Sequence, residues 1–197
     1  TGCGQCTRDC IAKNLSLREG KAEVSGTCIL CGHCVAVCPK GAVSIPEYDM
    51  ADVEEYDAQT FHLDPEIYLH AVKFRRSIRN FTSELLSRDK LERILDAGRY
   101  TATAKNDQDC RFILVQEHLE EFKQLVWQEM PHVLEALHHT DAPWHFLFSR
   151  FYERYQKDPK NDTLFFNCTS FLVIAADNPL DGGLASPNIE NMAVAEG

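Results

Sequence analysis

The sequence predicts an α+β protein in which a small cysteine-rich domain precedes a larger domain of helices around a few strands. Seven of the nine cysteines lie within the first 38 residues. The later part of the chain alternates helical periodicity with two short β-rich runs, which is typical of the α+β class. An acidic stretch separates the two parts. We therefore expect domains at residues 1–46 and 64–197, joined by a linker at 47–63.

Length and composition indicate a folded chain. Its 197 residues are 44% hydrophobic and 25% charged, close to the globular average, so extensive disorder is not expected. No apolar run approaches the roughly 20 residues that a membrane-spanning helix needs, and the first residues do not resemble a signal peptide. We expect a cytoplasmic protein without a membrane partner.

The net charge of -10 is unevenly distributed along the chain. Residues 46–66 carry eight acids and no Lys or Arg, whereas residues 73–111 carry ten bases against six acids. An acidic chain is repelled by the phosphate backbone of nucleic acids unless it has a large basic face, so nucleic acid is not an expected partner. A small anionic cofactor is compatible with the basic stretch.

The first domain contains a duplicated cysteine motif. An offset of 28 residues aligns three cysteines of the first copy with three of the second, and Gly4 with Gly32. The second copy reads C-x-x-C-x-x-C-x-x-x-C-P and ends at Pro39, a spacing typical of iron–sulfur ligands. The offset places the counterpart of Cys28 just before Thr1, so we expect one more cysteine upstream. The candidate cluster ligands are Cys3, Cys6, Cys10, Cys28, Cys31, Cys34 and Cys38.

Zinc sites and disulfides are the alternative interpretations of these cysteines. Zinc sites usually pair two C-x-x-C units a dozen or more residues apart, and rarely repeat three closely spaced cysteines. Disulfides would leave an odd thiol in a cytoplasmic chain. Iron–sulfur clusters are the favoured interpretation. Cys110 and Cys168 lie in apolar, strand-like surroundings and are expected to be buried structural thiols.

Over residues 1–46 the motif resembles the bacterial two-cluster ferredoxins, in which the last cysteine of each run binds the other cluster. The resemblance implies two 4Fe-4S clusters. One takes Cys10, Cys28, Cys31 and Cys34, and the other takes Cys3, Cys6, Cys38 and the cysteine expected upstream. Ile11 stands where the first copy should have proline, and we expect a locally altered turn there.

The elements of the second domain follow from helix caps and periodicity. Asp64 before a proline and a glutamate is typical of a helix start and predicts a helix over residues 65–74. Ser87 and the apolar residues after it, at three- and four-residue spacing, predict a helix that ends near Tyr100. Strands are predicted at 111–116 and 171–176, and helices at 117–130, at 144–156 and from 188 onwards.

The segment RRSIRNF, residues 75–81, follows the first of these helices. Three arginines and a serine within five residues supply planar guanidinium groups and a hydroxyl, which suit a phosphate. The alternative is a basic helix end that interacts favourably with its own carboxyl-terminal dipole. On these residues alone the two interpretations are equally supported.

A second segment, residues 101–115, leads from a helix end through a polar loop into a strand. Together with RRSIRNF it resembles the FMN-dependent nitroreductase family, over roughly residues 66–197. The resemblance implies a nitroreductase-type α+β domain, incomplete at its C-terminal end, and a homodimer with flavin at the interface. The FMN contacts that it implies are Arg75, Arg76, Ser77, Arg79, Asn106 and Gln108. Lys105 before Asn106, and Asp109 and Cys110 after Gln108, depart from the family loop, which usually reads Asn-x-Gln-Pro-Trp.

The two resemblances together imply an enzyme, an iron–sulfur flavoprotein oxidoreductase. Electrons would pass between 4Fe-4S clusters and FMN to reduce a nitroaromatic, quinone or similar small acceptor, with reduced ferredoxin or a nicotinamide cofactor as donor. The flavin carries this chemistry, so no side chain is assigned as catalytic. The alternatives are an electron-transfer relay to a protein partner without small-molecule turnover, and a regulatory module that keeps the clusters and has lost the flavin.

Overall fold

The computed structural model describes residues 1–140 and 143–197, which divide into two compact units. The first unit comprises Thr1–His70 and Ala102–Asp109, and the second comprises Ala71–Thr101 and Cys110–Gly197. The segment 102–109 thus packs with the cysteine-rich unit, although it lies in sequence between two elements of the other unit.

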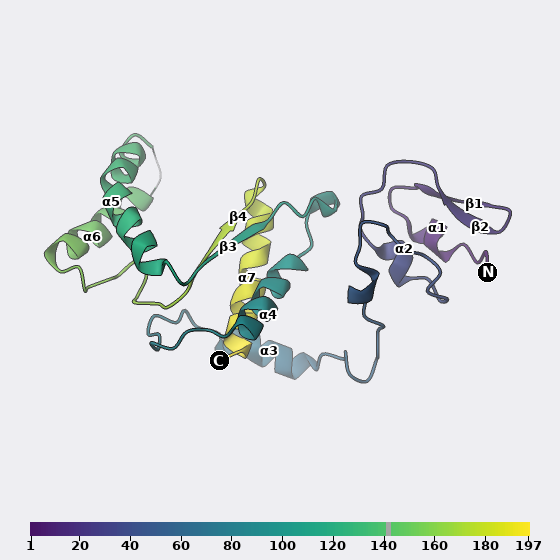
Figure 1. The fold of residues 1–197 in the computed structure, drawn as a ribbon, viewed down its shortest axis with the longest axis horizontal. Coiled ribbons are helices and arrows are strands. Elements are labelled where there is room, and N and C mark those ends of the chain that lie inside the picture. The colour runs from purple at the N-terminus through teal and green to yellow at the C-terminus, as the bar shows by residue number, and fades with distance from the viewer. Residues whose placement is uncertain (141–142) are drawn as a thin grey trace. The chain divides into compact units, whose positions relative to one another are not determined.

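The first unit consists of short elements connected by loops (Figure 1). A hairpin pairs its two strands antiparallel, with Leu15 opposite Val24. The two α-helices contact each other, and the first also contacts the hairpin. The elements are α1 (Gln5–Asp9), β1 (Leu15–Arg18), β2 (Lys21–Val24), α2 (His33–Ala36) and the 3-10 helices η1 (Met50–Asp52) and η2 (Ala104–Asn106).

The sequence repeat is also a structural repeat. Gly4 and Gly32 precede α1 and α2 directly, and both have left-handed backbone, with φ of 70° and 74°. Glycine adopts this conformation without steric cost, so both copies can turn sharply from a cysteine into a helix. A side chain at Gly32 would also meet Tyr48, whose hydroxyl oxygen lies 3.3 Å from the position of an added Cβ.

Few apolar side chains of the first unit are buried. Cys6 and Ile45 are 9% and 5% exposed, and both strands of the hairpin are mostly exposed. The acidic stretch after Ile45 is exposed except for the half-buried Tyr48. A unit with so small a core needs additional stabilisation, such as a metal centre.

Helices α3 (Pro65–Phe74) and α4 (Arg88–Arg99) confirm the two helices predicted from caps and periodicity. Asp64 caps α3 as expected, because its Oδ1 accepts hydrogen bonds from the N–H groups of Glu66 and Ile67 at 2.8 and 3.0 Å. No residue of α3 is buried.

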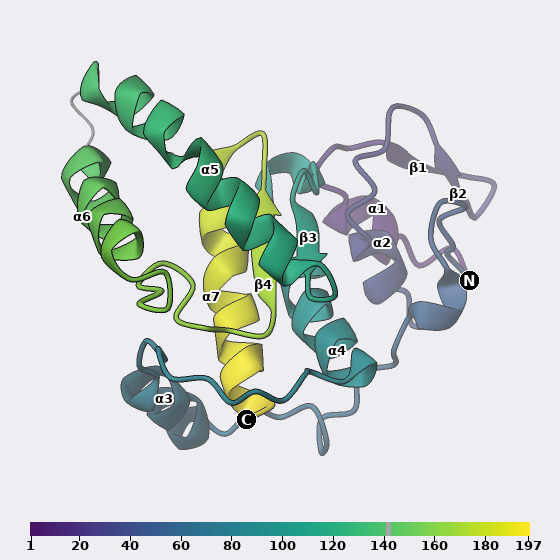
Figure 2. The same cartoon turned by 60° about the vertical axis from the view of Figure 1, so that its left-hand side comes forward.

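The second unit contains an antiparallel pair, β3 (Arg111–Val115) and β4 (Phe171–Ala175), with Arg111 opposite Ala175. Helices α4 and α7 (Pro179–Ala195) pack together beside this pair (Figures 1 and 2). Gly98 permits their close approach, since an added Cβ would lie 2.7 Å from Ile189 Cδ1 and 2.8 Å from Phe112 Cζ. The predicted α+β class is confirmed.

An aromatic core lies under the two remaining helices, α5 (Leu119–His138) and α6 (Trp144–Lys157), which pack against each other (Figure 2). Trp127 is 4% exposed and stacks on Tyr155, with ring centroids 4.3 Å apart and planes 6° from parallel. The buried members of this core are Leu119, Trp127, Met130, Phe165 and Cys168.

Two predicted helix boundaries were wrong. The helix expected to end at residue 130 continues through Pro131 to His138, because the burial of Trp127 and Met130 in the core outweighs the hydrogen bond that proline removes. The helix expected from residue 188 begins at Pro179, where the Asn178 side chain accepts from the Leu180 N–H at 3.1 Å. Its first turns are rich in small residues and show no amphipathic period.

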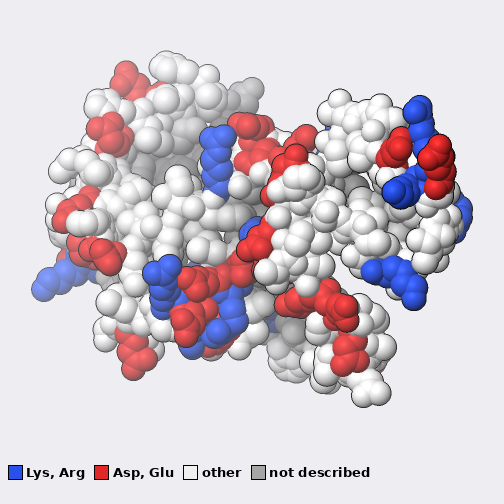
Figure 3. Space-filling view, turned by 45° about the vertical axis from the view of Figure 1, so that its right-hand side comes forward, with Lys and Arg blue, Asp and Glu red and all other residues white. Residues whose placement is uncertain are grey.

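Charged side chains of both signs are scattered among uncharged residues on the surface (Figure 3). On the face shown in Figure 3, acidic and basic side chains are interspersed. Arg18 and Glu23 lie 3.6 Å apart on the hairpin, and Arg88 and Glu92 lie 2.7 Å apart on α4. Such exposed pairs contribute under about 1 kcal/mol each. Within the part of the chain that the structure describes, no helix combines the length and apolarity needed to span a membrane.

Candidate functional site

A cavity of about 220 Å³ in the first unit is lined by thiols from both copies of the cysteine motif. Cys10 comes from the first copy, and Cys28, Cys31 and Cys34 come from the second. This is the set that the ferredoxin resemblance assigns to one cluster. The apolar part of the lining includes Ile11, Leu15, Val24, Ile29, Leu30, Val43 and Ile45.

The chemistry of this lining fits a 4Fe-4S cluster. Thiolates supply the ligands, apolar side chains limit the access of water, and the Leu30 N–H donates to Cys28 Sγ at 3.3 Å. Among residues 1–140 and 143–197, no three His, Cys, Asp or Glu side chains lie close enough together to hold a single metal ion. The thiols instead surround a wider space.

The second-copy thiols are near enough to influence one another electrostatically. Burial raises the pKa of the Cys34 thiol, and the nearby Cys28 and Cys31 sulfurs raise it further. Burial and the nearby cysteine sulfurs also raise the pKa of the Tyr48 hydroxyl. Iron relieves such crowding, because metal binding deprotonates thiols and compensates their charge.

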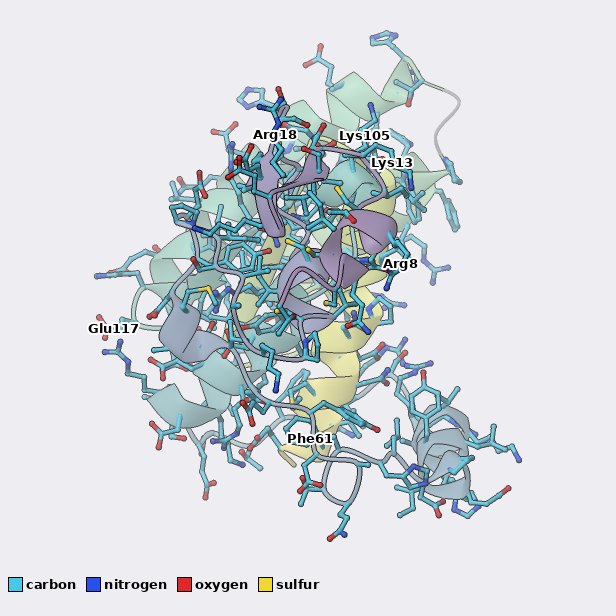
Figure 4. All side chains as sticks on the ribbon, turned by 90° about the vertical axis from the view of Figure 1, so that its right-hand side faces the viewer. Arg8, Lys13, Arg18, Phe61, Lys105 and Glu117 are labelled. Carbon is cyan, nitrogen blue, oxygen red and sulfur yellow. The ribbon has the colours of Figure 1, made fainter. Side chains whose placement is uncertain are left out.

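The other candidate ligands are Cys3, Cys6 and Cys38. The backbone N–H groups of Lys40 and Ala42 lower the pKa of Cys38, and the Ala42 N–H lies 3.2 Å from Cys38 Sγ. Burial and, to a smaller extent, the Cys3 sulfur of the other copy act in the opposite direction on the pKa of Cys38. Cys6 is buried. The exposed side chains of Arg8 and Lys13 lie at the surface of this unit (Figure 4), and Arg8 Nη1 donates to the Cys3 carbonyl at 3.1 Å.

The arginines of RRSIRNF lie in the second unit and have protein partners. Arg75 Nη1 lies 2.8 Å from Glu190 Oε1 on α7. Arg76 Nη1 donates to the carbonyls of Lys73 and Arg75, both at 2.7 Å, which is the helix-end arrangement considered as the alternative. The Arg79 guanidinium lies 5.8 Å from the centre of the Phe166 ring.

The donor set of this segment fits a phosphate group. Ser77 and Arg79 are exposed and Arg75 is half-buried, so their polar groups are accessible to a ligand. A guanidinium carries five N–H donors, and the bond to Glu190 occupies one of those of Arg75. The remaining donors of Arg75 are therefore available to an anion while the ion pair persists.

The other two predicted flavin contacts lie in the first unit. Asn106 Nδ2 donates to the carbonyls of Ile29 and Leu30 at 3.1 and 2.9 Å, which joins it to the loop between Cys28 and Cys31. The backbone N–H of Gln108 donates to Thr103 Oγ1 at 2.9 Å, and its side chain is exposed. The structure thus brings Asn106 to the candidate cluster ligands.

Tyr48 was missed by the sequence reasoning. Its hydroxyl donates to the Leu30 carbonyl, and its ring lies beside Gly32. The sequence hints at this contact only in that Tyr48 is an aromatic residue within an acidic stretch that has no regular apolar pattern. Because its partner is 18 residues away, no local pattern predicts this contact.

Comparison with known proteins gave two family matches. The family model described as the nitroreductase family matches residues 72–195, more than half of the chain. The model described as a 4Fe-4S dicluster domain matches residues 1–43. Among curated proteins, no relative matches this chain.

Several solved structures are similar to the chain. A BluB-like flavoprotein from Clostridium difficile 630 has 16% sequence identity and a TM-score of 0.49, over 66% of this chain and 70% of its own. A nitroreductase with bound FMN from Bacteroides fragilis has 18% identity and a TM-score of 0.47, over 66% and 65% of the two chains. A nitroreductase with bound FMN from Desulfitobacterium hafniense has 24% identity and a TM-score of 0.46, also over 66% and 65%.

Proposed function

We propose that this chain, which belongs to the nitroreductase family, passes electrons between iron–sulfur centres and FMN to reduce a small acceptor. Family membership makes it an FMN-dependent oxidoreductase, and the dicluster domain adds an iron–sulfur part. The finer part of the proposal is that two 4Fe-4S clusters are present and that the acceptor is a nitroaromatic, a quinone or a similar compound.

The observation that carries the proposal is the cavity shared by both cysteine copies. Cys10 reaches the same space as three thiols of the second copy, which supports crossed ligation of one cluster. A duplicated motif whose copies exchange ligands accounts for this shared lining.

The chain's own residues would bind, orient and shield these groups. The cysteine thiolates would hold the clusters, and the apolar lining would keep water from the iron–sulfur core. Arg75, Ser77 and Arg79 would anchor the FMN phosphate through charge-assisted hydrogen bonds. FMN, when bound, supplies the hydride-equivalent chemistry.

The proposed partners are an electron donor, either reduced ferredoxin or a nicotinamide cofactor, and a second copy of the chain. An exposed apolar surface on α3 supports the homodimer, since Ile67, Tyr68 and Val72 are 67%, 54% and 48% exposed. We also propose the cytoplasm as the location, because a reducing compartment keeps cysteines available as cluster ligands.

Cofactor analysis of the purified protein tests this proposal. We expect flavin absorption bands together with the broad iron–sulfur shoulder, acid-labile sulfide, and more than four irons per chain. Zinc in place of iron, or a spectrum without flavin, would contradict the assignment. Anaerobic turnover with a nitroaromatic and a quinone then tests the reaction. Fast electron exchange with ferredoxin, without reduction of either compound, would favour the relay.

A further inference from the structure

Two side chains hold one peptide carbonyl beside the candidate cluster ligands. The Leu30 carbonyl accepts from Asn106 Nδ2 at 2.9 Å and from the Tyr48 hydroxyl. The N–H of Leu30 donates to Cys28 Sγ at 3.3 Å. Asn106 Nδ2 also donates to the Ile29 carbonyl at 3.1 Å, and this carbonyl lies in the same planar peptide group as the Leu30 N–H. Anchoring the carbonyls on both sides of Leu30 therefore restricts the direction in which its N–H can point.

The backbone on both sides of this contact is strained. Leu30 has a φ of 54°, and Lys105, Asn106 and Gln108 have φ values of 55°, 59° and 47°. Left-handed backbone is unfavourable for a branched side chain such as leucine, and it persists only where the surroundings hold it. The bonds from Asn106 and Tyr48 supply that restraint at the residue whose N–H reaches the thiol.

Asn106 uses both of its amide hydrogens in this contact. Its Nδ2 donates to Ile29 and Leu30, and a carboxamide nitrogen carries two N–H groups. Two facing carbonyl oxygens require that the nitrogen, and not Oδ1, points toward them. The Asn106 nitrogen is therefore bonded to the cysteine loop, and only Oδ1 is left to accept a hydrogen bond from a flavin ring.

We propose that Asn106 and Tyr48 are positioning residues that set the reduction potential of the iron–sulfur centre on Cys28 by holding the Leu30 N–H against its sulfur. Hydrogen bonds to cluster sulfurs stabilise the more negative, reduced state and therefore raise the potential. The inference rests on the proposed iron–sulfur function. The same bonds tie this centre to the segment 102–109, which lies within the nitroreductase-family match.

The test is an electron paramagnetic resonance redox titration of the cluster-loaded full chain. Asn106→Ala and Tyr48→Phe each remove one anchor and should lower the potential of one centre, leaving the other unchanged. We expect a shift of up to about tenfold in the one-electron equilibrium, which corresponds to about 59 mV. The double variant should shift it further. Gln59→Ala, which truncates an exposed neutral amide elsewhere in the first unit, is the matched control and should leave both potentials unchanged.

Unchanged potentials in both single variants and in the double variant would overturn the inference. Equal shifts of both centres would also overturn it, because the anchors contact one loop only. If Asn106→Ala does not assemble the centre, Tyr48→Phe decides alone, since it keeps the ring beside Gly32 and loses only the hydroxyl. A native protein without cluster signals would be a separate result, because it contradicts the proposed function itself.

Discussion

At the scale of single residues, an arginine near an acidic partner can serve stability, ligand binding or both. Arg75 illustrates this, because its guanidinium pairs with Glu190 while its other donors are available to an anion. The side chains of the pair are 36% and 44% exposed, so the ion pair itself contributes at most about 1 kcal/mol. Binding and stability should therefore respond differently to substitution.

We predict that Arg75→Ala raises the FMN dissociation constant by roughly tenfold or more while unfolding free energy falls by less than about 1 kcal/mol. A charge-assisted contact contributes roughly 1.5–3 kcal/mol, and about 1.4 kcal/mol corresponds to one decade in affinity. Fluorescence titration with FMN and thermal denaturation measure the two effects. Glu190→Gln is the matched control, since it removes the same ion pair, keeps the arginine and should not weaken FMN binding. Equal FMN affinity in Arg75→Ala and the native chain would leave the arginine only a structural role.

The proposed crossed ligation predicts which cysteine substitutions should have the same effect on iron content. Cys38→Ala should remove the centre that includes Cys3, and the double variant with Cys3→Ala should contain no less iron than Cys38→Ala alone. Combining Cys38→Ala with Cys28→Ala should remove both centres, because these two cysteines stand at the two ends of one run but would bind different clusters. Iron and sulfide analysis of the three variants measures this. If the Cys38 and Cys28 double variant keeps as much iron as Cys38→Ala alone, ligation is not crossed.

At the scale of elements, features set by neighbouring residues were predicted from the sequence, whereas features set by long-range contacts were not. The start of α3 follows from Asp64 and the residues next to it, and the structure confirms it. The start of α7 does not follow from local pattern, because Gly182, Gly183 and Ala185 give no period and packing supplies the stability. In the candidate site, cysteine spacing suggested the ligands. The bond from Asn106 to Leu30 joins residues 76 apart and had no local signal.

The packing of α5 on α6 predicts contrasting effects for the two tryptophans. Trp127→Ala should lower the unfolding free energy by about 3–5 kcal/mol, because it opens a cavity between Tyr155 and Phe165. Trp144→Ala should change it by no more than about 0.5 kcal/mol, since Trp144 is 56% exposed. Urea denaturation monitored by circular dichroism compares them. If Trp127→Ala lowers the unfolding free energy as little as Trp144→Ala is expected to, Trp127 does not anchor this core.

At the scale of the whole molecule, the two units depend on different sources of stability. The second unit buries an aromatic cluster, whereas the first buries only Cys6 and Ile45 among its apolar side chains in the described part of the chain. Metal binding in such a small unit is coupled to folding, because the unfolded chain offers no preformed site. The iron–sulfur centres should therefore act as the core of the first unit.

We predict that removing the clusters with a chelator unfolds the first unit and leaves the second folded. Hydrogen exchange measured by mass spectrometry should show lost protection at residues 1–46. Residues 102–109 should lose protection as well, because Asn106 bonds to the carbonyls of Ile29 and Leu30. Strands β3 and β4 should keep theirs, since they pair with each other and lie in the unit with the aromatic core. Reconstitution with iron and sulfide should restore protection only in the first unit. Loss of protection in β3 and β4 on chelation would show that the units do not fold independently, and unchanged protection at residues 1–46 would show that the small core suffices without metal.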